Sequence, residues 1–416
     1  MQYDFDQEIN RQGTCSMKWE FMQAGDDMLH WEQTDRCFGP DRTLPLWVAD
    51  MDFRCPPPVV DALVARAAHG IYGYTDKTEA YYDAVAGWMA RRHGWKIAPE
   101  WILTTPGVVP ALFMLVRTFA APGEKVLIQP PVYYPFFSAI RQNGAELVTS
   151  PLIYEGGRYR MDFDDLERKA RDPLLKMAIL CSPHNPVGRV WSPDELRRFG
   201  DICADNGVLV VSDEIHSDLI YSGHSFTPFA SLSEALAQNA VVCTAPSKTF
   251  NFAGLHVSNI LIPNPEIRAR FQRTLANDGL IGINTFGLVA LEAAYNHGED
   301  WLRQMLDYVE GNFRYLQAFV AERIPEITVI VPEGTYLVWL DCRRLGLDKL
   351  ALKRLILEEA KVYLDDGFMF GPEGEGFQRV NLACPRALLA EALHRIARAV
   401  EGLAKSQGPA HERSTT

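Results

Sequence analysis

The chain has 416 residues, of which 47% are hydrophobic and 23% charged, and its formal net charge is −12. This composition is typical of a soluble globular protein, and the length allows one large and one small domain. The negative charge argues against a general nucleic-acid-binding protein, which needs a basic surface to neutralise phosphates. No apolar segment reaches the roughly 18 residues of a membrane span, and the polar N-terminus has no signal-peptide pattern. We therefore expect a cytoplasmic protein that binds neither nucleic acid nor membrane.

Predicted strands and helices alternate through the middle of the chain. Short apolar, β-branched segments predict strands at Lys125–Gln129, Met177–Cys181, Val208–Ser212, Val241–Thr244 and Asn259–Ile262. Helical periodicity lies between them, as in Val109–Phe119 and in Asp194–Asn206, which follows a Ser-Pro start signal. Continuous apolar strands are buried on both faces. The pattern therefore predicts an α/β fold with a mostly parallel sheet between layers of helices.

The last third of the chain changes character. Long amphipathic helices, around Glu299–Ile324 and Lys349–Glu359, surround short strands such as Tyr336–Leu340. This arrangement predicts a smaller α+β domain. We expect a large domain at residues 48–290 and a small domain formed by residues 1–47 and 291–405. The polar end of the chain, residues 406–416, is expected to be a disordered tail.

Polar or aromatic residues follow the first predicted strands, at the edge of a parallel sheet where ligands bind. Gly107 stands at a helix start, where free backbone amides favour a phosphate. Tyr133 offers a ring that can stack on a planar ligand, and Asn185 lies in the loop after Met177–Cys181. Taken singly, each feature is explained equally well or better by an ordinary turn or by loop packing.

Two ionisable residues follow the next strands. Asp213 ends a hydrophobic strand, and a carboxylate there needs a cationic partner, such as a protonated ring nitrogen. His216 lies three residues further on, but no second His or Cys follows at ligand spacing, so a metal is not expected. Lys248 follows Val241–Thr244. A lysine removed from water loses its proton readily and attacks carbonyl groups, although a structural ion pair is the simpler interpretation of this residue alone.

Together these residues predict a pyridoxal phosphate (PLP) site. One sheet edge presents an anion cradle, a stacking ring, an Asn, a buried Asp and a desolvated Lys. PLP needs each of them: a phosphate site, a stacking face, a donor to its O3′ atom, an acidic partner for the pyridinium nitrogen, and a lysine that forms a Schiff base.

The order and spacing of these motifs resemble the fold-type I PLP enzymes of the class I/II aminotransferase superfamily. Within that superfamily, the MalY/PatB group of cystathionine β-lyases (carbon–sulfur lyases) is the most similar. The likeness extends from about Asp6 to Ala404. The segments that carry it are LWVADMDF (Leu46–Phe53), HGIYGYTD (His69–Asp76), CSPHNPVGRVW (Cys181–Trp191), SDEIHSDL (Ser212–Leu219), APSKTFNFAGL (Ala245–Leu255) and RVNLACPR (Arg379–Arg386).

The resemblance implies how PLP is held. Lys248 would form the Schiff base and act in catalysis, and Asp213 would hold the pyridinium nitrogen. Phosphate contacts are implied at Gly107, Val108, Val109 and Ser247. Contacts to the ring or its O3′ atom are implied at Tyr133, Asn185 and His216.

The resemblance also implies a substrate site and a homodimer. Arg379 would bind the α-carboxylate of an amino-acid substrate in a bidentate pair, with Ala49 in the same site. Tyr74 would reach across a dimer interface and act in the neighbouring active site.

Two positions depart from the aminotransferase pattern. His216 stands where aminotransferases usually carry a Tyr, as it does in the lyase group. His256 replaces a phosphate-binding Arg eight residues after Lys248, which leaves the phosphate with less cationic help. The sequence therefore favours a PLP-dependent carbon–sulfur β-lyase, which converts cystathionine or related cysteine S-conjugates to pyruvate, ammonia and a thiol by α,β-elimination.

Three other functions are less consistent with the sequence than a lyase. An aminotransferase on the same scaffold shares the early steps of the reaction. A regulatory protein on this fold is expected to lose Lys248 or Asp213, and both are present. A nicotinamide-dependent enzyme is not favoured, because the glycine-rich segment Gly371–Phe377 does not link a strand to a helix.

Overall fold

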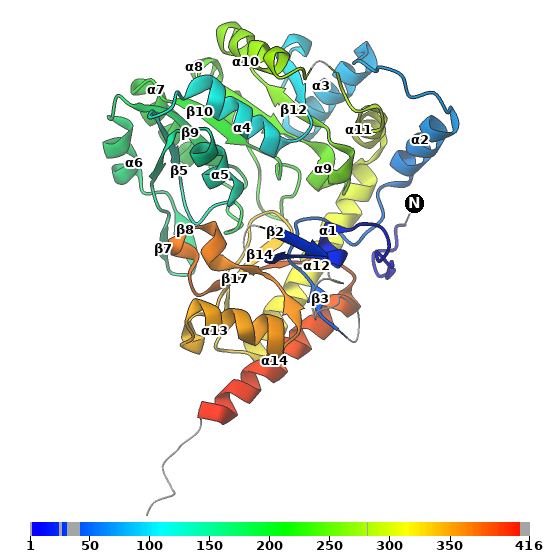
Figure 1. Ribbon diagram of the computed structural model, residues 1–416, viewed down its shortest axis with the longest axis vertical. Coiled ribbons are helices and arrows are strands. Elements are labelled where there is room, and N and C mark those ends of the chain that lie inside the picture. Colours follow the sequence, from blue (N-terminus) through cyan, green and yellow to red (C-terminus); the bar gives the residue numbers. More distant parts are fainter. Residues whose placement is uncertain (1, 25–26, 31–41, 281, 408–416) are drawn as a thin grey trace, which may run out of the picture.

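The computed structural model describes residues 2–24, 27–30, 42–280 and 282–407. Its largest element is a seven-stranded sheet with the strand order β4-β12-β11-β10-β9-β5-β6 (Figure 1). All neighbouring strands are parallel except β12, which is antiparallel to both β11 and β4. The predicted α/β fold with a mostly parallel sheet is confirmed. The strands are β4 (Ile102–Thr105), β5 (Lys125–Ile128), β6 (Glu146–Thr149), β9 (Leu175–Cys181), β10 (Leu209–Asp213), β11 (Ala240–Thr244) and β12 (Ser258–Leu261).

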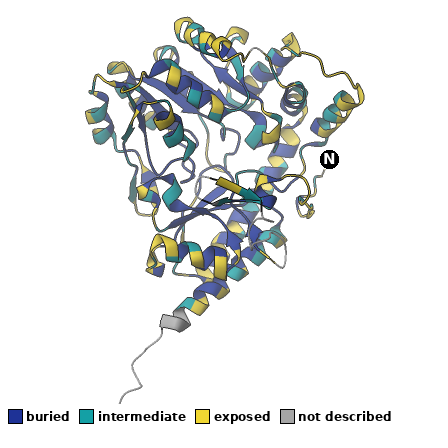
Figure 2. Cartoon of the chain, in the orientation of Figure 1, coloured by how far each residue is buried: buried dark blue, intermediate teal, exposed yellow. Residues whose placement is uncertain are grey.

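Helices cover both faces of this sheet, which explains its uninterrupted apolar strands. Val211 packs on one face and its neighbour Val210 on the other, and both are fully buried. The helices on the Val211 face are α4 (Val108–Phe119), α5 (Pro135–Gln142) and α10 (Pro265–Asn277). The opposite face is covered by α3 (Glu79–His93), α6 (Phe163–Ala170), α7 (Pro193–Asp205) and α11 (Thr285–His297). Figure 2 shows the buried sheet between helices whose outer sides are exposed.

Local signals in the sequence set several helix ends. Helix α7 begins after Ser192, whose hydroxyl accepts from the Glu195 amide at 3.2 Å, while the Glu195 carboxylate accepts from the Ser192 amide at 2.8 Å. This reciprocal pair is a capping box. Helix α11 ends just before Gly298, where a Cβ atom would lie 2.5 Å from Cε1 of Phe250. Only glycine therefore fits at the joint that leads into α12 (Glu299–Arg323).

A second, antiparallel sheet lies beside the first, with the order β13-β14-β17-β16. Its strands are β13 (Thr328–Val329), β14 (Leu337–Asp341), β16 (Asp365–Asp366) and β17 (Phe377–Asn381). It packs with α12 and with α14 (Arg386–Gln407) (Figure 1).

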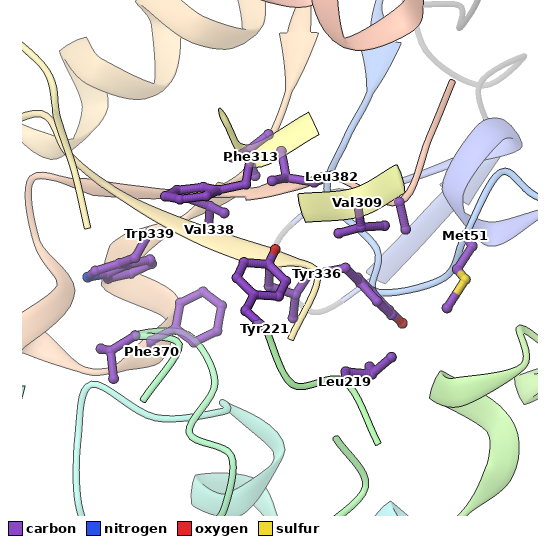
Figure 3. Close-up of a cluster of buried hydrophobic side chains, with 14 of the residues drawn as sticks. Met51, Leu219, Tyr221, Val309, Phe313, Tyr336, Val338, Trp339, Phe370 and Leu382 are labelled. Atoms are coloured by element: carbon purple, nitrogen blue, oxygen red, sulfur yellow. The ribbon is translucent and has the colours of Figure 1, made fainter. Parts of the chain in front are cut away.

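Buried side chains join the two units. Figure 3 draws Leu219 and Tyr221, from the segment after β10, in one hydrophobic cluster with Val309 and Phe313 of α12 and with Tyr336. The expected boundary at residues 290–291 falls inside α11, which packs with α2 (Pro57–Ala68) and α3 on the large sheet. We propose that the two domains divide after this helix, at the joint around Gly298.

The N-terminal segment packs against this second unit. Strand β3 (Leu44–Pro45) pairs with β15 (Val362–Tyr363), and the Tyr3 amide donates to Gln304 of α12 at 3.1 Å. At the other end of the chain, α14 extends two residues into the expected tail, and residues 408–416 lie outside the described residues. Across the described residues, no helix combines the length and the apolar character that crossing a membrane requires.

Candidate active site

The predicted site residues of the large domain lie at one edge of the seven-stranded sheet. Asp213 is the last residue of β10, and Lys248 lies in α9 (Pro246–Thr249), directly after β11. Asn185 follows β9, and Gly107 follows β4. Because these strands are parallel, their carboxyl ends meet at the same edge. The antiparallel strand β12 brings its amino end, preceded by His256, to this edge as well.

Lys248 ends in a site that is suited to a neutral amine. Its Nζ atom donates to the carbonyl oxygen of Ala49 at 2.6 Å, and the Tyr336 hydroxyl donates to the same oxygen at 2.9 Å. Removal from solvent lowers the pKa of Lys248 to about 8; the positive charge of Arg379 acts in the same direction, and the charge of Asp213 opposes them. With this pKa, about a tenth of the amine is unprotonated at pH 7, and this form can act as a nucleophile or base.

Asp213 is a buried carboxyl group that forms no ion pair within the described part of the chain. Its Oδ1 atom accepts from the Ile215 amide at 3.2 Å. Burial raises the pKa of Asp213 to about 7, against the opposing effects of the Ile215 amide and the charge of Lys248. A buried carboxylate is costly without a cation. A protonated pyridine nitrogen, as in PLP, would supply one, so this residue fits the cofactor.

The start of α4 fits a phosphate group. Gly107 caps the helix, and a Cβ atom there would lie 3.3 Å from Cδ of Pro110, tighter than most contacts allow. The first amides of a helix, here those of Val108 and Val109, have no partner within the helix and favour an anion. The hydroxyl groups of Thr105 and Ser258 lie 2.7 Å apart across the neighbouring strands.

The remaining predicted phosphate residues lie beside this helix start. Ser247 precedes Lys248 in α9 and is half-buried. His256 is exposed, and its Nδ1 atom lies 3.2 Å from the carbonyl oxygen of Pro106. The residue that replaces the aminotransferase arginine therefore lies beside the start of α4.

Arg379 is buried on β17 and is held from three sides. Its Nη1 atom donates to Oδ1 of Asn185 at 3.1 Å, and Nη2 donates to the carbonyl oxygen of Trp47 at 2.9 Å. Nη2 also forms a direct ion pair with Asp365, which lies opposite it on β16. Nε has no partner among the described residues. This guanidinium joins Asn185 of the large unit to the small sheet, and part of it remains free for a ligand.

Two predicted cofactor residues add rings to the site. His216 is buried, and its ring lies edge-on to Tyr336 with 6.1 Å between centroids. Burial lowers the pKa of His216 to about 3, and the charges of Lys248 and Arg379 act in the same direction, so the imidazole is neutral. Tyr133 is half-buried at the start of α5, and its ring is tilted against Tyr134 with 5.3 Å between centroids.

Tyr74 is the one predicted site residue that does not join the others. It is fully exposed on the loop between α2 (Pro57–Ala68) and α3. Within the described part of the chain it does not contact the other predicted site residues. An exposed tyrosine on an extended loop is compatible with a role in a neighbouring subunit.

Residues that sequence reasoning did not single out hold the segment around Ala49. Asn381 donates from Nδ2 to the carbonyl oxygens of Val48 and Asp50 at 2.7 and 2.6 Å. Asn251, whose φ of 61° is left-handed, accepts from the Met51 amide at 2.9 Å and donates back to the Met51 carbonyl at 2.9 Å. Asn251 lies in the segment Ala245–Leu255 and Asn381 in Arg379–Arg386. The family resemblance of these two segments was the only feature of the sequence that pointed to either asparagine.

The chain matches the description "Aminotransferase class I and II" over residues 44–396. It is 46% identical over 393 residues to cystathionine beta-lyase PatB of Bacillus subtilis, covering 94% of this chain and 98% of the relative. It is 33% identical over 389 residues to protein MalY of Escherichia coli, covering 93% and 96%. The chain belongs to the class I and II aminotransferase family. The family predicted from the motifs is confirmed.

Solved structures of relatives share this fold throughout. Cystalysin from Treponema denticola, which contains a pyridoxal 5′-phosphate cofactor, is 40% identical with a TM-score of 0.91, covering 97% of this chain and 100% of the other. The PLP-bound C-S lyase from Staphylococcus hominis is 34% identical with a TM-score of 0.87, covering 96% and 98%. The fold predicted from the sequence is therefore also the fold of these two solved structures, over at least 96% of this chain.

Proposed function

We propose that this protein is a PLP-dependent carbon–sulfur β-lyase that cleaves cystathionine or a related cysteine S-conjugate to pyruvate, ammonia and a thiol. The observation that carries the proposal is the pair of Lys248 and Asp213 at one sheet edge. The first is an amine with a pKa of about 8, and the second is a buried carboxyl group that forms no ion pair among the described residues. The names of the relatives at 46% and 34% identity favour lyase chemistry within the family.

The residues of the chain supply binding and proton transfer. PLP, when bound, withdraws electrons from the substrate Cα atom. Lys248 would hold the cofactor covalently, and its amine, when free, would remove the Cα proton of the substrate. Asp213 would accept a hydrogen bond from the ring nitrogen of the cofactor and so stabilise the protonated form of that nitrogen. Arg379 binds the substrate carboxylate through its unpaired N–H groups.

Elimination completes the reaction at Cβ. The Cβ–S bond breaks, the sulfur leaves with the electron pair, and it takes up a proton to become the thiol. The three-carbon fragment reacts with water to give pyruvate and ammonia. Tyr133 and Tyr74 are the candidate donors for the leaving group. His216, with its pKa of about 3, is neutral near pH 7 and therefore adds no positive charge beside Lys248 and Arg379.

A homodimer and a cytoplasmic location are part of this proposal. Apolar side chains are exposed on α2 and on the loop after it, where a soluble monomer would normally keep polar residues. They include Val64 at 62% and Ile71 at 68% relative exposure, and the fully exposed Tyr74 follows them. A second copy of the chain on this face would cover the apolar residues and receive Tyr74.

The deciding experiment measures two products in parallel. Purified protein with PLP is given cystathionine, and pyruvate and thiol are assayed; a second reaction supplies a keto-acid acceptor and tests for amino-group transfer. We expect pyruvate and thiol in equal amounts and little transfer. Transfer without thiol release would identify an aminotransferase instead. A regulatory protein on this fold would give neither reaction with any sulfur amino acid.

Substitution of the lysine tests the cofactor assignment. Lys248→Ala should lose the visible absorbance of covalently held PLP and reduce kcat by at least about 1,000-fold, because both the attachment point and the base are removed. Lys176→Ala, which removes a lysine from the far part of β9, is the matched control and should leave both properties unchanged. A Lys248→Ala protein that is still active and yellow would contradict the proposal.

A further inference from the structure

Charged residues near the N-terminus hold the segment that contains Ala49. Arg11 donates from Nη2 to Oδ2 of Asp50 at 2.7 Å, and from Nη1 to Oδ1 of Asp50 at 3.0 Å and Oδ1 of Asp52 at 2.8 Å. Lys18 Nζ lies 2.7 Å from Oδ2 of Asp52. The Trp19 indole donates to Oδ1 of Asp52 at 2.8 Å. We call these five residues the N-terminal clamp.

The clamp is largely removed from solvent. The Lys18 side chain is fully buried, and those of Arg11 and Asp50 are each 21% exposed. Burial alone would raise the pKa of Asp52, but the charges of Lys18 and Arg11 outweigh it, so the pKa is lowered and the carboxylate stays ionised. Buried ion pairs are weak contributors to net stability, because desolvation offsets their attraction. Their position next to the active site suggests a second role.

One residue separates the clamp from the active-site lysine. Asp50 directly follows Ala49, whose carbonyl oxygen accepts from Lys248 Nζ at 2.6 Å. Arg11 also donates to the Met51 carbonyl at 3.2 Å, so it holds the backbone on the far side of Asp50. The path from Arg11 to the Lys248 amine therefore runs through a short, fixed segment of backbone.

Charges from several elements act on Lys248. After burial, which lowers the pKa of Lys248, the charge of Asp50 is the next largest influence and raises it. Arg379 on β17 lowers it, and Asp213 on β10 raises it. His216 also faces the amine, but it is neutral. Arg11 does not touch Lys248, but its positive charge offsets that of Asp50.

We propose that Arg11 is a positioning residue for the active-site lysine: by pairing with Asp50 it fixes the Ala49 carbonyl against the Lys248 amine and partly neutralises the carboxylate beside that contact. The inference rests on the proposed function, since it concerns the amine that takes up PLP. It assigns the N-terminal segment, which lies outside the large sheet, a part in setting the protonation of Lys248.

The test measures how fast the apoenzyme takes up PLP at different pH values, followed by absorbance. Uptake needs the unprotonated Lys248 amine, so its rate rises with pH around the pKa of that amine. Arg11→Gln removes the closest cation from Asp50 and leaves only Lys18, whose Nζ atom lies 3.8 Å from Oδ1 of Asp50. The stronger negative charge favours the protonated form of Lys248 and should move the midpoint up by about half a pH unit. Asp50→Asn removes the negative charge and should move the midpoint down by a similar amount.

Opposite shifts separate this role from a structural one. The double variant Arg11→Gln/Asp50→Asn should return close to the wild-type midpoint, and Arg11→Lys, which keeps the charge, should shift little. Arg314→Gln removes a surface ion pair with Glu310 on α12 and should have no effect. Should Arg11→Gln fail to fold, Asp50→Asn and Arg11→Lys carry the test.

The experiment can contradict the positioning role of Arg11 separately from the assignment of PLP as the cofactor. Midpoints that do not move, or that move in the same direction in Arg11→Gln and Asp50→Asn, would reject the positioning role while PLP uptake itself stays intact. A wild-type protein that takes up no PLP would instead reject the cofactor and with it the proposed function. Thermal unfolding of each variant shows whether a change in stability accompanies the shift.

Discussion

Arg379 combines a structural ion pair with a predicted substrate contact in one side chain. Its guanidinium pairs directly with Asp365, and both side chains are almost completely buried. Burial raises the pKa of Asp365 to about 6, against the charge of Arg379. A bound substrate would place a second carboxylate on the same guanidinium. Because two negative charges at one site repel each other, binding should favour the protonated form of Asp365.

This competition predicts a pH dependence of substrate affinity. Asp365 is protonated below about pH 6 and becomes charged as the pH rises through that value. The affinity of an unreactive amino-acid analogue should therefore weaken several-fold between about pH 5 and 7.5, measured by the absorbance of the bound cofactor. Asp365→Asn should bind more tightly near pH 7.5 and lose this pH dependence. Weaker binding with the dependence unchanged would mean that Asp365 instead orients Arg379.

The residues found and missed by sequence reasoning differ in where their partners lie. Lys248, Asp213 and Asn185 stand at strand ends, and any parallel sheet brings such positions to one edge. Asp365 gave no signal, because its importance comes from lying opposite Arg379 in the β16–β17 register. Neither this register nor the contact of Tyr336 with Ala49 follows from local sequence. The roles of the residues that were found remain predictions.

At the scale of elements, the start of α4 is the part of the site that is best suited to a phosphate group. It combines a glycine cap, free amides and a tight approach to Pro110. Gly107→Ala adds a methyl group where the phosphate and Pro110 leave little space. We expect PLP affinity of the apoenzyme to fall by about tenfold, roughly 1.4 kcal/mol, with a small change in thermal stability. Titration of apoenzyme with PLP measures the effect.

A control for this variant lies in another helix. Gly402 in α14 has open space around the position of a Cβ atom. Gly402→Ala should leave PLP affinity unchanged and stabilise the protein by up to about 1 kcal/mol, since alanine favours helix over glycine. Equal PLP affinity in Gly107→Ala and the wild type would remove the helix start from the phosphate site.

Most element positions were predicted from the sequence, and the misses have identifiable causes. Five strands of the large sheet, β5, β9, β10, β11 and β12, lie within two residues of their predicted ends, because they are short apolar segments bounded by polar loops. Strands β4 and β6, at the two edges of the sheet, were not predicted. The direction of β12 was not predicted. Its connection from β11 contains only α9 and the turn Ala253–Leu255. The predicted helix Lys349–Glu359 is α-helical to Arg354 and then widens into a π-helical turn, a change that hydrophobic periodicity does not reveal.

At the scale of the whole molecule, the proposed dimer makes a prediction about mixed subunits. Lys248→Ala lacks its lysine, and Tyr74→Phe lacks the hydroxyl that would serve the neighbouring site. If Tyr74 acts across the interface, a heterodimer of the two variants contains one intact site. Equal mixing with random reassociation should restore about a quarter of wild-type activity. Activity that never exceeds the sum of the separate variants would place Tyr74 outside the partner's site.

The segment around Ala49 also determines how late in synthesis the site around Lys248 can form. Asn381 holds Val48 across 333 residues of sequence, and β3 pairs with β15 near the end of the chain. Contacts so remote form late, because most of the chain must first be made and ordered. The last strand of the seven-stranded sheet ends at residue 261, so this sheet can assemble before Asn381 and β15, the partners of the N-terminal segment, have been synthesised. The nascent protein therefore acquires its lysine site only when translation is nearly finished.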